Sequence, residues 1–135
     1  MRLDTDSYIF KPLCYDPIDL LHQHNRTYAF NVHTTDPDWV TIGLWNLVDE
    51  YARSHSQVEA NLQRNGWEWP ENRNPEEMGK HDFPTYYNNF EIVKLDAFRR
   101  PDVRAWLDEI MRVPERIYKY RWGELLDRCI THDQS

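Results

Sequence analysis

Two carboxylates near the amino end have a spacing that suits a divalent cation. Asp4 and Asp6 follow residues Met1–Leu3, which we expect to be the end of a strand. Alternate residues of an extended chain point to the same side, and carboxylate oxygens are the hard ligands that Mg²⁺ and Mn²⁺ prefer. A solvated acidic turn fits the same pattern, so the residues alone leave both interpretations open.

Glu91 is a third acid of interest, because it interrupts an apolar and aromatic stretch, Tyr87–Val93 (YNNFEIV). A carboxylate in such a strand lies either on the exposed face of an edge strand or in a polar pocket with asparagine partners. The pattern by itself favours the exposed edge strand.

Other kinds of site are excluded by composition and spacing. The chain has a net charge of −7, so it lacks the excess of Lys and Arg that nucleic-acid binding requires. His22 and His24 lie two apart on an expected helix, so they face different directions and are expected at the surface rather than in a zinc site. The sequence has neither a Gly-rich phosphate loop nor a nucleophile elbow. No run approaches the roughly 18 apolar residues of a membrane span.

Aromatic residues make up 14% of the chain, with six Trp and eight Tyr, which is high for one small domain. Such rings either fill a small core or line a pocket for sugars, whose C–H faces stack on them. The two cysteines, Cys14 and Cys129, form one disulfide or remain two free thiols, and an isolated pair favours free thiols.

The elements that must position these acids form a mixed α/β unit. We expect a helix after Asp16, which is a good N-cap followed by proline, and a strand from Thr27 to His33. Asp36-Pro37 repeats the cap-plus-proline signal, so a long helix is expected to start there. Ser56 and Glu59 form a capping-box pattern for a further helix that runs to about Arg64.

The second half of the chain is predicted to begin with an irregular stretch. Residues 66–84 are rich in Pro, Asn and Gly, which break regular structure. A strand centred on Phe90–Val93 follows, and Pro101 then begins a helix whose apolar positions, from Val103 to Met111, share one face. Pro114 is expected to end that helix.

Five short blocks follow one another along the chain. They are Arg2-Leu3-Asp4, Tyr15-Asp16-Pro17-Ile18, Asn25-Arg26-Thr27-Tyr28-Ala29-Phe30, Asn89-Phe90-Glu91-Ile92 with the following Leu95-Asp96-Ala97-Phe98-Arg99, and Tyr120-Arg121-Trp122-Gly123. In this order they resemble the Golgi alpha-1,2-mannosyltransferases of fungi, glycosyltransferase family 15. The first is similar to the family's Arg-Leu/Val-Glu-Pro segment, and the fourth matches its Ser-Asn-Phe-Glu-Ile and Leu-Asp-Phe-Phe-Arg segments.

The resemblance implies a GT-A fold that transfers mannose from GDP-mannose to a mannosyl glycan acceptor with retention of configuration. It implies Mn²⁺ or Mg²⁺ as the cofactor, held by Asp4 with Asp6 as a looser equivalent, and Glu91 as the catalytic carboxylate. It places four residues around the sugar. They are Tyr28, Asn89, Arg121 and Trp122.

Departures from the family pattern sharpen these expectations. Asp4 stands where the family has Glu, and Arg128 falls where the family has a metal-binding His, so His132, one helical turn further, is the candidate replacement. In this family a nucleotide-binding part precedes the acidic motif, and a membrane anchor holds the enzyme in the Golgi lumen. We therefore expect residues 1–135 to form one glycosyltransferase-like domain, the carboxyl-side part of a GT-A-like fold, without that upstream part.

Two other functions remain open at this stage. A catalytically weakened or inactive chain could keep the acceptor cleft and serve as a glycan-binding or scaffold protein. An acidic protein-interaction module would bind neither a sugar nucleotide nor a glycan.

Overall fold

The computed structural model describes residues 1–120 and 122 and shows a mixed α/β protein. Its strands are β1 (Arg2–Leu3), β2 (Tyr28–Asp36) and β3 (Phe83–Val93). Within the described part, they form an antiparallel three-stranded sheet in the order β1-β3-β2. Both main strands are longer than the sequence predicts, and β3 lies in the centre of the sheet rather than at its edge.

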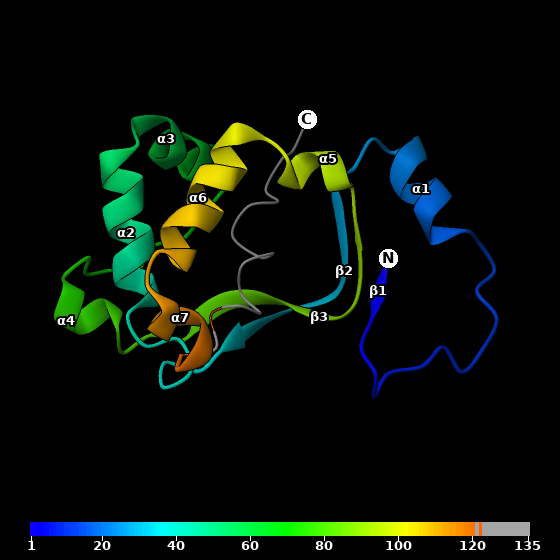
Figure 1. Ribbon diagram of the computed structural model, residues 1–135, viewed down its shortest axis with the longest axis horizontal. Coiled ribbons are helices and arrows are strands. Elements are labelled where there is room, and N and C mark those ends of the chain that lie inside the picture. Colours follow the sequence, from blue (N-terminus) through cyan, green and yellow to red (C-terminus); the bar gives the residue numbers. More distant parts are fainter. Residues whose placement is uncertain (121, 123–135) are drawn as a thin grey trace.

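Helices gather at the two ends of the sheet (Figure 1). The helices are α1 (Pro17–Gln23), α2 (Leu44–Ser54), α3 (Ser56–Arg64), α4 (Pro75–Met78), α5 (Leu95–Phe98), α6 (Pro101–Met111) and α7 (Pro114–Tyr118). Figure 1 shows α2, α3, α4, α6 and α7 at one end and α1 at the other, with the curved β2–β3 ribbon between them. The sheet therefore connects a helical end to an amino-terminal end.

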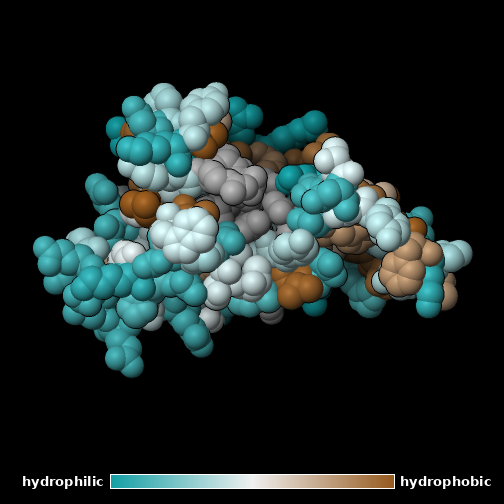
Figure 2. Space-filling model, turned by 90° about the horizontal axis from the view of Figure 1, so that it is seen from below, coloured by the Kyte–Doolittle hydropathy of each residue, from teal (hydrophilic) through white to brown (hydrophobic). Residues whose placement is uncertain are grey.

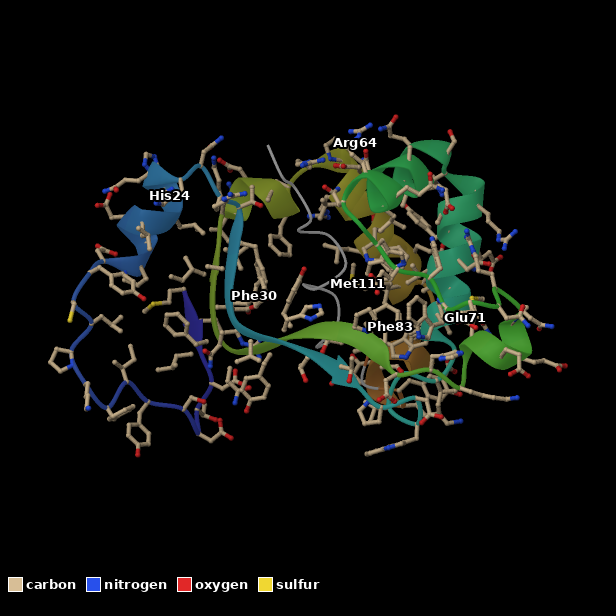
Figure 3. The ribbon with its side chains drawn as sticks, turned by 180° about the vertical axis from the view of Figure 1, so that it is seen from behind. His24, Phe30, Arg64, Glu71, Phe83 and Met111 are labelled. Carbon is tan, nitrogen blue, oxygen red and sulfur yellow. The ribbon has the colours of Figure 1, made fainter. Side chains whose placement is uncertain are left out.

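The ladder between β2 and β3 changes register partway along. Phe30 pairs with Glu91, whereas Val32 pairs with Tyr87, so β3 contributes two more residues than β2 between these pairs. Extra residues of this kind bend a strand and increase its local twist. Figure 3 shows the result: Phe30 lies at the bend, and Phe83 lies at the helical end of the same ribbon.

The hydrophobic core lies at the helical end. Its buried residues are Leu44, Trp45, Leu47, Val48, Met78, Phe83, Trp106, Ile110 and Trp122. The apolar faces of α2 and α6 supply most of them, as their helical spacing predicts. Met111, which we expected on the same face of α6, is exposed instead. It is the last residue of the helix.

The irregular stretch after α3 packs onto this core rather than extending into solvent. Trp67 and Trp69 lie against Trp45, with ring centroids 5.7 and 6.0 Å from it. Arg73 holds the stretch in place, because its guanidinium lies 3.9 Å from the centroid of the Trp69 ring. Arg73 Nε also donates to Asp49 Oδ1 at 2.6 Å. Burial alone would lower the pKa of Arg73, but the hydrogen bonds to Glu59 and Asp49 outweigh burial and raise it.

The junction of α6 and α7 is fixed by a second cluster of charges. Arg116 donates to the backbone carbonyl of Glu109 at 2.6 Å, and Arg112 donates to its carboxylate at 2.8 Å. The hydrogen bond from Arg112 holds the pKa of Glu109 below its ordinary value. The prediction that Pro114 ends α6 is wrong. α6 has already ended at Met111, and Pro114 is the first residue of α7.

The amino-terminal end is built differently. α1 has no buried residue, and the segment between β1 and α1 carries exposed apolar side chains, including Tyr8 and Phe10. His22 and His24 are exposed, as predicted, and Cys14 is an exposed free thiol, whereas Cys129 lies outside the described residues. In the part that the structure describes, the helices are too short or too polar to cross a bilayer.

Candidate active site

The most deeply buried acid of the described chain is Glu91, which is 3% exposed at the centre of the sheet. Its Oε2 accepts a hydrogen bond from the Tyr28 hydroxyl at 2.7 Å, and its Oε1 lies 3.3 Å from Arg2 Nη1. A buried carboxylate is stable only when such donors replace water. The prediction of an exposed edge strand is therefore wrong: Glu91 occupies a polar pocket, and the partners are Tyr and Arg rather than Asn.

Strand pairing brings these three residues together from distant parts of the sequence. Arg2 is the direct partner of Glu91 on one side of β3, and Phe30 is its partner on the other side. Tyr28 lies two residues from Phe30 and so points to the same face of the sheet. The hydroxyl of Tyr28 can therefore reach Glu91 diagonally across the two strands.

Arg2 also joins Glu91 to Asp4. Its Nη2 lies 3.1 Å from Asp4 Oδ1, while Nη1 faces Glu91, so one guanidinium bridges two carboxylates. The backbone N–H of Asp4 donates to the carbonyl of Asn89 at 2.9 Å and extends the β1–β3 pairing by one residue. Arg2 thus holds the carboxylates of Asp4 and Glu91 close together.

Asp6 lies in the turn beyond Asp4 and is exposed, with the hydroxyl of Ser7 3.5 Å from its Oδ1. Mg²⁺ sites commonly use one or two carboxylates and complete their coordination with water and substrate phosphates. Asp4 and Asp6 fit the role of these one or two carboxylates, because both side chains are accessible to solvent. Across residues 1–120 and 122, no cluster of three or more His, Cys, Asp or Glu side chains is placed to hold a metal, and His132 lies outside the described residues.

Aromatic rings border Glu91 on the same face. The rings of Tyr28 and Phe30 are stacked with their centroids 5.9 Å apart, and the ring centroids of Phe30 and Tyr86 are 3.9 Å apart. Figure 3 shows Phe30 at the bend of the ribbon. Sequence reasoning missed Phe30 and Tyr86, although the alternation of side chains along β2 already places Phe30 on the face of Tyr28.

The remaining predicted sugar-binding residues lie in different places. Asn89 is half-buried, and its amide donates to the Tyr87 hydroxyl at 2.8 Å and faces Ser7 Oγ at 3.4 Å. Trp122 is 3% exposed and lies in the core cluster, where its ring approaches Gly43. Arg121 lies outside the described residues. Their contact with a sugar stays a prediction.

Comparison with known families decides what kind of protein carries this site. The model of the family described as glycolipid 2-alpha-mannosyltransferase matches residues 1–132. The chain belongs to this mannosyltransferase family. The match includes every predicted site residue, from Asp4 to His132.

Several fungal members of the family are similar to the chain. An O-glycoside alpha-1,2-mannosyltransferase homolog of Schizosaccharomyces pombe is 29% identical over 91% of this chain and 32% of its own length. The probable mannosyltransferase KTR2 of Saccharomyces cerevisiae is 25% identical over 91% of this chain and 31% of its own length. Glycolipid 2-alpha-mannosyltransferase 1 of Candida albicans is 23% identical over 91% of this chain and 27% of its own length.

The chain therefore spans about a third of the length of these family members. No solved structure matches it.

Proposed function

We propose that the chain is a mannosyltransferase domain of GT-A-like fold that transfers mannose from GDP-mannose to a mannosyl glycan acceptor with retention of configuration. One observation carries the proposal: the buried Glu91 carboxylate is held by Tyr28 and Arg2 beside Asp4, within a chain of mannosyltransferase ancestry. The resemblance supplies the donor, the stereochemical outcome and the GT-A-like fold.

Glu91 has the properties that a retaining transfer needs. A carboxylate that faces the anomeric carbon stabilises positive charge as the donor bond breaks, or attacks that carbon directly. The hydrogen bond from Tyr28 and the contact with Arg2 engage both oxygens and fix the plane of the carboxylate. Because Glu91 is 3% exposed, its charge acts in a site with little water, where electrostatic stabilisation is strongest.

Asp4 and Asp6 would hold the Mn²⁺ or Mg²⁺ ion. When bound, that ion neutralises charge on the departing diphosphate. Holding the ion would loosen the ion pair of Asp4 with Arg2, whose guanidinium would remain with Glu91. The resemblance assigns Tyr28, Asn89, Arg121 and Trp122 to sugar contacts. His132 is the candidate replacement for the family's metal-binding His, since Arg128 stands at that position.

A glycan-binding or scaffold protein without transfer is the second candidate. The observation that favours it is the ion pair between Arg2 and Asp4, which occupies one of the two carboxylates assigned to the metal. This candidate predicts that mannosides bind and that GDP does not.

The two candidates separate in a calorimetric titration with GDP and Mn²⁺, followed by GDP-mannose. The transferase predicts binding that depends on Mn²⁺ and is lost in Asp4→Asn. A transfer assay then compares Glu91→Gln with Glu71→Gln, since Glu71 is exposed. We expect Glu91→Gln to reduce the rate by about 10²-fold or more and Glu71→Gln to leave it unchanged. Equal rates in both variants would remove Glu91 from the mechanism.

A further inference from the structure

A tripeptide outside the candidate active site matches the acceptor pattern for N-linked glycosylation. Asn25-Arg26-Thr27 lies between α1 and β2, and the pattern accepts any residue except proline in its middle position. No other asparagine of the chain is followed two positions later by Ser or Thr. A pattern of three residues also arises by chance, so the structure around Asn25 decides whether its side chain is accessible.

The turn after α1 fixes the backbone of Asn25 but does not use its side chain. Its N–H donates to the carbonyl of His22 at 3.0 Å, and the next N–H, of Arg26, donates to Leu21 at 3.0 Å. This is the Schellman pattern, which requires a left-handed residue, and Asn25 has a φ of +48°. The side chain of Asn25 is exposed, and within residues 1–120 and 122 it takes part in no hydrogen bond. Its amide nitrogen is therefore accessible.

The third position of the pattern, Thr27, has no such role in the turn. Asparagine tolerates the left-handed region better than most residues, so the turn alone accounts for Asn25. The carbonyl of Thr27 accepts from the N–H of Lys94 at 2.8 Å, next to the β2–β3 ladder. Valine would serve that backbone contact equally well, because it also favours extended structure. The hydroxyl of Thr27 thus separates an acceptor pattern from a turn.

A glycan at this position extends into solvent. All residues from His22 to Arg26 are exposed, and α1 buries none of its own residues. Figure 3 shows His24, the neighbour of Asn25, at the outer edge of the molecule, whereas Phe30, the strand partner of Glu91, lies at the bend of the ribbon. Carbohydrate on Asn25 therefore displaces no packed side chain.

The position also lies near an apolar surface. Ile18 and Leu20 of α1 are 52% and 43% exposed. A helix rises about 1.5 Å per residue, so these residues lie about 8–10 Å from Asn25 along the helix. Figure 2 shows further apolar side chains at the end of the molecule that carries the amino-terminal segment. A bulky polar glycan beside this surface would favour its contact with water over contact with other chains.

We propose that Asn25 is an N-glycosylation site in a compartment that supplies a lipid-linked oligosaccharide diphosphate. Asn25 Nδ2 attacks C1 of the first sugar, and the C–N bond forms as the bond from C1 to the diphosphate oxygen breaks. Nδ2 loses one proton to a base of the transferring enzyme, and the lipid diphosphate leaves with the electron pair of the broken bond. Neither Asn25 nor Thr27 belongs to the candidate active site, so this modification is independent of the proposed transfer.

Translation of the full chain behind a cleavable secretory signal, in the presence of rough microsomes, tests the site. We expect one glycosylated species on electrophoresis, which peptide-N-glycosidase returns to the mobility of the bare chain. That enzyme converts the modified asparagine to aspartate, so mass spectrometry of the peptide identifies the position. An Asn-Ala-Thr tripeptide appended to the carboxyl end is the internal positive control, and it adds a second glycan.

Four variants separate the acceptor pattern from the turn. Asn25→Gly should remove the glycan completely and keep the turn, since glycine adopts the left-handed conformation. Thr27→Val should also remove it, whereas Thr27→Ser should retain it, because serine supplies a hydroxyl. Asn31→Gln is the matched control and should change nothing, because Asn31 is exposed but lies outside any acceptor pattern.

Two results would overturn the site. One is a chain whose appended tripeptide is glycosylated while Asn25 is not. The other is a glycan that persists in Asn25→Gly or in Thr27→Val. Neither result bears on the transferase, because these variants change no residue of the candidate active site. Calorimetry with GDP and Mn²⁺ on Asn25→Gly measures the transferase separately, and we expect the same binding as in the wild type.

Discussion

The two ends of the sheet differ in how they use aromatic side chains. At the helical end, Phe83 is fully buried, and Trp45 and Trp106 are 3% and 6% exposed within the core cluster. At the amino-terminal end, Tyr8 and Phe10 are more than three-quarters exposed, and α1 buries none of its residues. One set of rings stabilises the fold, and the other set is available for contact.

This difference sets how much each region contributes to stability. Burial of a Phe side chain stabilises a protein by about 1.5–3 kcal/mol relative to an exposed one, so the helical end supplies most of the folding free energy. Glu91 lies on the strand that links the ends, and its partners Arg2 and Tyr28 come from the neighbouring strands. The site is thus anchored by the sheet.

The sharpest test of this comparison uses two phenylalanines. Phe83→Ala leaves a cavity in the core, and we expect it to reduce the free energy of unfolding by about 3–5 kcal/mol. Phe10→Ala removes a ring that is 77% exposed, so we expect a change below about 0.5 kcal/mol. Urea denaturation followed by circular dichroism measures both. Similar losses in the two variants would show that the amino-terminal end also carries folding free energy.

A smaller effect is expected from two arginines that share one partner. Arg73 and Arg53 both pair with Asp49, but the side chain of Arg73 is 26% exposed and that of Arg53 is 58% exposed. Arg73→Ala removes the cation from a carboxylate that is 10% exposed, and we expect a loss of about 1–3 kcal/mol. Arg53→Ala removes a surface pair worth about 0.5 kcal/mol or less. Thermal unfolding of both variants would contradict this ranking if Arg53→Ala gave the larger shift.

The smallest effect is expected to remain local. Asp16 caps α1 by accepting from the N–H groups of Ile18 and Asp19 at 2.9 and 3.3 Å. Asp16→Ala should lower the free energy of local unfolding of α1 by about 1 kcal/mol. Hydrogen exchange of the α1 amides should therefore become about fivefold faster. Because α1 buries none of its residues, exchange in α2 should not change. Faster exchange in both helices would mean that α1 is coupled to the core.

Local signals in the sequence predict several elements well. The cap at Asp16 and the proline after it place α1 correctly, since both act through neighbouring backbone groups. The helix that begins at Pro101 and buries Val103, Trp106 and Ile110 is also confirmed. In each case the stabilising contacts lie within one turn of the helix or along one of its faces.

Two predicted helix caps show where local signals fail, although α3 itself runs from Ser56 to Arg64 as predicted. Asp36-Pro37 predicts a start at residue 36, but Asp36 pairs with Phe83 in the sheet, and α2 begins after Gly43, whose φ of +76° suits glycine. The predicted capping box of Ser56 and Glu59 is wrong as well, because α3 has no side-chain cap and Glu59 binds Arg73. A distant partner outcompetes the local one in both cases.

The candidate site depends even more on distant partners. Glu91 is 89 residues from Arg2 and 63 from Tyr28 along the chain, so neither partner is visible in the pattern around it. The family resemblance points to Asp4, Glu91 and Tyr28. In the structure Arg2 links Asp4 to Glu91, and Tyr28 donates directly to Glu91. That linking role of Arg2 could not be read from sequence, since it requires the order of the strands.

The change of register between Phe30 and Val32 has an evolutionary consequence. In a regular ladder, a slip of one residue turns every side chain to the opposite face. Here the ladder is interrupted between the pair of Phe30 with Glu91 and the pair of Val32 with Tyr87, so a slip on one side need not continue to the other. Insertions and deletions near the helical end can therefore accumulate between relatives without rotating Glu91 out of its pocket.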